Sequence, residues 1–71
     1  MREIGIIGFG QFGQFMARHL APFFEVTAYD RFDFSAEAGK AEVRWGDFES
    51  VSGKPIVIFS VPLFAFETVL R

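Results

Sequence analysis

The sequence contains no cysteine and a single histidine among its 71 residues. Without cysteine the chain has no disulfide, no thiol nucleophile and no cysteine-ligated metal, and this composition suits a cytoplasmic protein. One histidine and scattered carboxylates offer little for a transition-metal site. We therefore expect neither a disulfide nor a metal ion in this chain.

Positive charge is also scarce, and it is nowhere clustered. Seven lysine and arginine residues stand against nine aspartate and glutamate residues, which gives a net charge of −2. Nucleic-acid binding depends on clustered cations that displace counterions, so we expect no DNA or RNA partner. The apolar runs are well short of the roughly 20 residues that a membrane helix needs. The charged start leads directly into a strand pattern, so we expect no signal peptide and no membrane partner.

The length allows one small domain and not two. A chain of this size buries only about 60% of the surface that its unfolded form exposes, so its stability should be marginal. Phenylalanine is abundant, with 11 residues, and so much ring surface has to pack against something. We expect either a surface that contacts a partner, for which a second copy in a homodimer is one possibility, or a chain that is one piece of a larger domain.

Strand and helix patterns alternate along the chain. Short apolar runs predict strands over residues 4–7, 25–29, 43–45 and 55–59. Apolar residues at three- and four-residue spacing predict a helix over 11–20, ended by Pro22, and another that begins at Pro62. Single helical turns are predicted over 35–38, with Ser35 as the N-cap and Gly39 as the stop, and over 47–51.

This order of elements predicts an α/β fold with a parallel sheet, because strands that alternate with helices are joined by right-handed crossovers. The expected architecture is the first half of a Rossmann-type, doubly wound sheet with strand order 3-2-1-4. We interpret residues 1–71 as a partial dinucleotide-binding domain (β-α-β-β-β-α) in which no substrate or dimerisation domain is present.

A glycine motif follows the first predicted strand. The six residues Gly8-Phe9-Gly10-Gln11-Phe12-Gly13 match G-x-G-x-x-G, and Asp30 lies about twenty residues further on. In this motif Gly8 permits the tight turn, Gly10 lets the backbone approach a pyrophosphate, and Gly13 lets the helix pack on the sheet. The free N–H groups and the positive dipole end of the helix then bind phosphate without a lysine.

A glycine-rich turn that binds nothing is the competing interpretation of this motif. The strand before it, the helix after it and the acidic residue beyond it together favour a dinucleotide. The sequence has no G-K-[ST] here, which excludes a Walker-type triphosphate site. We therefore assign all six residues of the motif to a cofactor site.

Asp30 and Arg31 follow the second predicted strand and bear on the choice of cofactor. A carboxylate at this position accepts hydrogen bonds from the adenosine ribose hydroxyls and repels a 2′-phosphate, so Asp30 favours NAD. Arg31 is either a pair for a 2′-phosphate or an ordinary solvated charge, which leaves NADP open.

Ser60, Val61 and Pro62 follow the fourth predicted strand. Ligands of open parallel sheets bind at this edge, near the point where the strand order reverses, so all three are candidate cofactor contacts. Ser60 either caps the following helix or faces the ribose on the nicotinamide side. His19 lies along the first helix, far from any position for hydride transfer, and we assign it a structural or surface role. No catalytic residue is assigned.

The segment Ile6–Phe15, with its G-F-G-x-F-G form, resembles the amino-terminal part of prephenate and arogenate dehydrogenases. Two further stretches agree. Arg31–Ser35 resembles the R-x-D-x-S stretch of plant-like members, and Ser60–Leu63 followed by Glu67–Arg71 is similar to the segment after the family's fourth strand.

The resemblance implies an NAD(P)-dependent oxidative decarboxylation of prephenate or arogenate in tyrosine biosynthesis. In that family a histidine near the end of the nucleotide domain and a helical, dimer-forming domain complete the site, and neither corresponds to any part of this chain. We therefore expect the isolated chain to be inactive. Two alternatives stay open: a fragment of another β-hydroxyacid-type dehydrogenase or NADP reductase, and a non-enzymatic NAD-sensing module.

Overall fold

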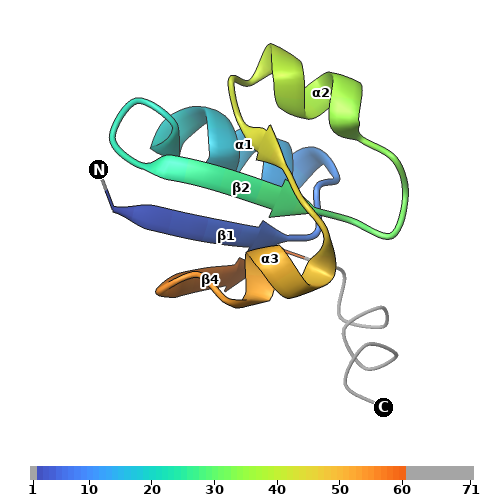
Figure 1. Ribbon diagram of the computed structural model, residues 1–71. Helices are drawn as coiled ribbons and strands as arrows, with labels where there is room; N and C mark the ends of the chain where they lie inside the picture. The colour runs from blue at the N-terminus through green and yellow to red at the C-terminus, as the bar shows by residue number, and fades with distance from the viewer. Residues whose placement is uncertain (1, 61–71) are drawn as a thin grey trace.

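The computed structural model describes residues 2–60 of the chain. Its elements follow in the order β1 (Glu3–Ile7), α1 (Gln11–Leu20), β2 (Glu25–Tyr29), α2 (Ser35–Lys40), β3 (Arg44–Trp45), α3 (Phe48–Ser52) and β4 (Ile56–Phe59) (Figure 1). The helix predicted from Pro62 lies outside the described residues. Over the part that is described, no helix has the length and apolar character needed to cross a membrane.

The four strands form one parallel sheet in the order β3-β2-β1-β4. β1 lies inside the sheet, and its last four residues are buried, as expected for a strand that is covered on both faces. This arrangement confirms the predicted α/β fold and the predicted strand order. It is compatible with the first half of a Rossmann-type sheet.

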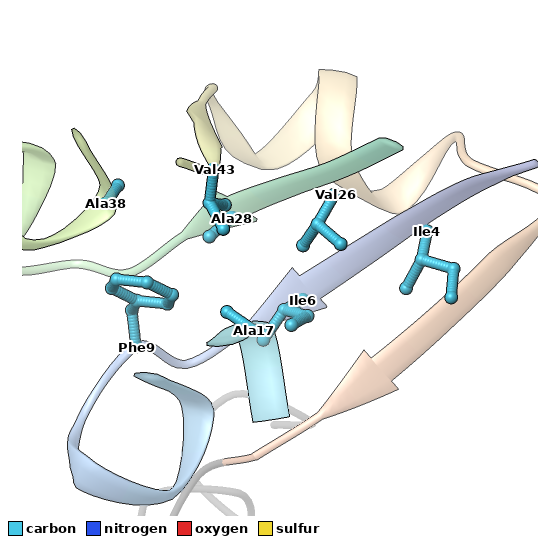
Figure 2. Close-up of a cluster of buried hydrophobic side chains, with 8 residues drawn as sticks. All are labelled: Ile4, Ile6, Phe9, Ala17, Val26, Ala28, Ala38 and Val43. Atoms are coloured by element: carbon cyan, nitrogen blue, oxygen red, sulfur yellow. The ribbon is translucent and has the colours of Figure 1, made fainter. Parts of the chain in front are cut away.

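Helices cover both faces of this sheet. Ile4 and Ile6 of β1 point to one face, where they share a buried cluster with Ala17 of α1 and Ala38 of α2 (Figure 2). Gly5, between them in sequence, points to the opposite face, where Val51 of α3 packs directly against it. A Cβ on Gly5 would overlap the Val51 carbonyl oxygen, so this glycine allows α3 to approach β1 closely.

The aromatic surface is only partly buried within the part that is described. The exposed large side chains are mostly phenylalanines: Phe12, Phe15, Phe23, Phe32, Phe48 and Phe59. Exposed apolar surface of this kind often marks a contact with another chain or with another part of the same protein. The homodimer stays a prediction.

The limits of α2 differ from those predicted. The helix runs through Gly39 to Lys40, and Phe34 occupies the N-cap position without a side-chain bond, so the predicted roles of Ser35 and Gly39 are wrong. The side chain of Asp33 replaces the expected cap, because its Oδ1 accepts the Ser35 N–H at 2.9 Å. Hydrogen bonding from the Ser35 hydroxyl, and from its N–H, holds the pKa of the Asp33 carboxyl below its ordinary value.

The end of α2 is formed by Glu42 rather than by a glycine. Glu42 has a φ of 58°, and its N–H donates to the Gly39 carbonyl while the Val43 N–H donates to the Ala38 carbonyl. This pair of bonds is a Schellman motif, which normally places glycine at the left-handed position. A side chain there strains the backbone.

Glu42→Gly is therefore expected to stabilise the fold. Relief of the left-handed strain exceeds the added entropy cost of glycine by about 0.5–1 kcal/mol. In a domain of this size that gain raises the melting temperature by roughly 2–8 °C, measured by circular dichroism. Glu37→Gly, inside α2, is the control and should lower it, since glycine is a poor helix former. A lower melting temperature for Glu42→Gly would contradict the prediction.

Candidate functional site

The chain leaves β1 through a turn that requires glycine. Gly8 has a φ of 100°, a conformation that residues with a side chain rarely adopt. Its N–H donates to the Tyr29 carbonyl on β2 at 2.8 Å, and its carbonyl accepts from the Ser60 Oγ just beyond β4. Gly8 is thus held from both neighbouring strands, and the tight turn predicted at this position is confirmed.

Phe9 anchors the turn in the core. Its ring is fully buried and packs edge-on against Trp45, with 5.8 Å between ring centroids. Figure 2 shows that Phe9 enters the buried cluster from the turn after β1. Its N–H donates to the Asp30 Oδ2 at 2.7 Å, and its carbonyl accepts from the Gln14 Nε2 at 3.0 Å. Both backbone groups of Phe9 are therefore held by side chains.

Asp30 joins the turn to the chain that follows β2. One carboxylate oxygen accepts from Phe9, and the other accepts from the Phe32 N–H at 3.0 Å. Each oxygen of an ionised carboxylate accepts more than one hydrogen bond, so both retain capacity for a ligand hydroxyl. The exposed Arg31 lies beside this group, with its guanidinium 4.9 Å from the centre of the Phe32 ring.

The start of α1 is open to an anion. Gly10 is its N-cap, and no side chain among residues 2–60 caps it. The Gln14 N–H makes the first bond of the helix, to the Gly10 carbonyl, so the three preceding amides have no partner within α1. These amides belong to Gln11, Phe12 and Gly13, and the first turn contains no acidic residue. They lie at the positive end of the helix dipole, which favours negative charge.

The second and third glycines of the motif differ in their surroundings. A Cβ added to Gly13 would overlap the Gly8 carbonyl oxygen and come within 2.8 Å of the Ser60 Oγ, so packing alone requires glycine there. Gly10 has an ordinary φ of −71°, and an added Cβ would meet no atom of residues 2–60 within 4 Å. Nothing in this part of the chain requires glycine at position 10.

Ser60 reaches the same turn from the end of β4. Its N–H donates to the Ile7 carbonyl at 2.8 Å, and this bond extends the β1–β4 pairing by one residue. Its hydroxyl is bound to Gly8. The adjacent candidates Val61 and Pro62 lie outside the described residues, as does the following helix, which Ser60 would cap in one of its two predicted roles.

The single histidine, which was assigned a structural or surface role, lies away from the turn. His19 is exposed near the last residue of α1, where its Nδ1 is 2.9 Å from the Phe15 carbonyl oxygen and its ring packs on Phe15. At 1.5 Å per residue it is roughly 12 Å along the helix from Gln11. No group of three or more His, Asp and Glu residues within residues 2–60 is arranged to hold a metal ion.

Sequence reasoning missed two residues that shape the turn. Gln14 was not singled out, although its amide holds the Phe9 carbonyl, and Trp45 was assigned only to a packed strand. The distance in sequence hides the second contact, because Phe9 and Trp45 meet only after β3 pairs with β2. The one available signal for Gln14 was its position one helical turn after Gly10.

Comparison with solved structures finds a protein of similar structure. The chain resembles the PH0520 protein from Pyrococcus horikoshii OT3, with a TM-score of 0.73 and 29% sequence identity over 87% of this chain. The match covers 19% of that protein, so this chain spans about a fifth of its length. No family model matches the sequence, and no curated protein matches it.

Proposed function

We propose that this chain binds NAD as the cofactor-binding part of an NAD(P)-dependent dehydrogenase. The observation that carries the proposal is that nothing in the described chain requires glycine at position 10. The other two glycines of the motif are needed by the turn and by helix packing, whereas a Cβ on Gly10, the N-cap of α1, would meet no atom of residues 2–60 within 4 Å. A ligand that brings a diphosphate against these amides gives a reason for glycine at position 10.

The residues around the turn fit the parts of a dinucleotide. The amides of Gln11, Phe12 and Gly13 would hold the diphosphate, because they are donors at a helix N-terminus with no acidic neighbour in the first turn. Asp30 would accept the ribose hydroxyls with the capacity that its two backbone bonds leave. Its negative charge disfavours a 2′-phosphate, so NAD is preferred over NADP.

The dehydrogenase assignment rests on the resemblance of Ile6–Phe15 and the two later stretches to prephenate and arogenate dehydrogenases. When bound, the nicotinamide would accept the hydride. The contribution of this chain is to bind and orient the dinucleotide, and the substrate site of such an enzyme would belong to a longer protein.

Replacement of Asp30 tests the ribose assignment. In Asp30→Ser the affinity for NADPH relative to NADH should rise about tenfold, because removal of about 1.4 kcal/mol of repulsion corresponds to a factor of ten. Overall affinity should fall as well, since the bond to Phe9 is lost. Both titrations can be followed by Trp45 fluorescence, because Trp45 contacts Phe9 of the turn.

Asp47→Ser is the matched control for this experiment. Asp47 caps α3 through a 2.7 Å bond to the Ser50 N–H, and serine caps helices comparably well. The ratio of the two affinities should not change in this variant. An unchanged ratio in Asp30→Ser would remove Asp30 from the ribose site, and a folded parent chain that binds neither nucleotide would refute the proposed function.

A further inference from the structure

A single peptide group of the turn is held at both ends by side chains that follow two different strands. The carbonyl of Gly8 and the N–H of Phe9 belong to the same peptide plane. The carbonyl accepts from the Ser60 Oγ, beyond the end of β4, and the N–H donates to the Asp30 Oδ2, beyond the end of β2. We call this arrangement of Ser60, the Gly8–Phe9 peptide and Asp30 the peptide clamp.

We propose that Ser60 is a positioning residue of the nucleotide site that acts through the peptide clamp without touching the nucleotide. The proposal rests on the proposed function for its link to binding. It also assigns Ser60 a different role from either expectation drawn from the sequence, helix cap or ribose contact.

The position of the Ser60 hydroxyl supports this role. It lies close to both the turn and α1, since it donates to the Gly8 carbonyl and a Cβ on Gly13 would come within 2.8 Å of it. The backbone N–H of Ser60 donates to the Ile7 carbonyl, so the hydroxyl is the remaining donor of this residue, and it donates to the Gly8 carbonyl. Without it the Gly8 carbonyl would lose this donor in a partly buried position.

The peptide clamp also gives Ser60 an influence on Asp30. A hydrogen bond to a peptide carbonyl polarises the N–H at the other end of the same plane, so the two bonds strengthen each other. Loss of the Ser60 hydroxyl should therefore loosen the Phe9 N–H from Asp30 and let the carboxylate turn away from its place beside the turn. Binding of the ribose would weaken, although the Asp30 carboxylate itself is not substituted.

Amide hydrogen exchange of the chain without nucleotide tests the peptide clamp directly. In Ser60→Ala the Phe9 amide should exchange about tenfold faster than in the parent chain. The Gly8 amide, bound to Tyr29, and the Phe32 amide, bound to the other oxygen of Asp30, should change by less than about twofold, because neither belongs to the Gly8–Phe9 peptide group. A tenfold change at Phe9 corresponds to the loss of about one hydrogen bond, the one from its N–H to Asp30. Ser60→Thr keeps the hydroxyl and should restore slow exchange at Phe9.

Ser52→Ala is the matched control, because the Ser52 Oγ also donates to a backbone carbonyl, that of Glu49 in α3. It should leave Phe9 exchange unchanged. Equal acceleration at all three amides in Ser60→Ala would indicate a general loss of stability and overturn the proposal, as would unchanged exchange at Phe9.

Titration with NADH completes the test. The dissociation constant for NADH should rise about five- to tenfold in Ser60→Ala and return toward the parent value in Ser60→Thr. Normal NADH affinity in a Ser60→Ala variant whose Phe9 amide exchanges fast would overturn the positioning role alone. A folded parent chain that binds no NADH would instead refute the proposed function, while the exchange data still report on the peptide clamp.

Discussion

Gly10→Ala is expected to fold like the parent chain and to lose most of its affinity for NADH. The fold should survive because an added Cβ meets no atom of residues 2–60 within 4 Å and the φ of −71° suits any residue. Affinity should fall because the same Cβ occupies the space through which a diphosphate would reach the amides of Gln11 and Phe12.

The expected loss follows from the bonds involved. Hydrogen bonds to a charged group contribute about 1.5–3 kcal/mol each, so loss of two of them costs at least 3 kcal/mol. Since about 1.4 kcal/mol corresponds to a factor of ten, the dissociation constant should rise roughly 100-fold or more. Fluorescence titration with NADH measures this change, and thermal unfolding of the same sample shows that the variant is folded.

Two controls separate binding from stability. Gly10→Ser places a good N-cap residue at the start of α1, so it should unfold at the same or a higher temperature while it still binds NADH poorly. Gly39→Ala should gain about 0.5–1 kcal/mol and bind normally, because Gly39 lies inside α2 and a Cβ there meets nothing within 4 Å in the described chain. Unchanged NADH affinity in both Gly10 variants would refute the assignment of the phosphate site.

Much of the fold follows from local patterns. β1 and β4 are short apolar runs, and α1 has an apolar stripe that ends before Pro22. The spacing of the apolar residues and the proline after the helix therefore identify these elements. α2 was harder, because the Asp33 carboxylate takes the Ser35 N–H and glycine at position 39 continues the helix. Side-chain bonds to nearby backbone decide such ends, and residue preference alone does not distinguish the alternatives.

The candidate site was predictable only in outline. The glycine pattern identified the turn, and the position of Asp30 after β2 placed it at the same edge of the sheet. The bond from the Phe9 N–H to Asp30 and the bond from the Ser60 hydroxyl to the Gly8 carbonyl were not predictable, since each joins residues far apart in sequence through a turn of specific shape. Such contacts depend on the shape of the turn after β1 as well as on the register of β1 with both neighbours, and the hydrophobic pattern bears only on the register.

Gly13→Ala is expected to destabilise the fold strongly, in contrast to Gly10→Ala. The added Cβ would overlap the Gly8 carbonyl oxygen, a backbone atom that is itself held by Ser60, so α1 has to move away from the turn. Overpacking of this kind costs about 1–3 kcal/mol, a large part of the stability of a domain this small. At about 4–8 °C per kcal/mol, the melting temperature should fall by roughly 4–24 °C.

The contrast between Gly13→Ala and Gly10→Ala is the informative quantity, because the two positions lie in the same motif and receive the same methyl group. Thermal unfolding of the pair without nucleotide should show a large loss at Gly13 and at most about 1 kcal/mol at Gly10, the cost of alanine at an N-cap. Equal losses at both positions would mean that Gly10 is also required by packing. Gly10 would then no longer point to a ligand, and the proposed function would lose the observation that carries it.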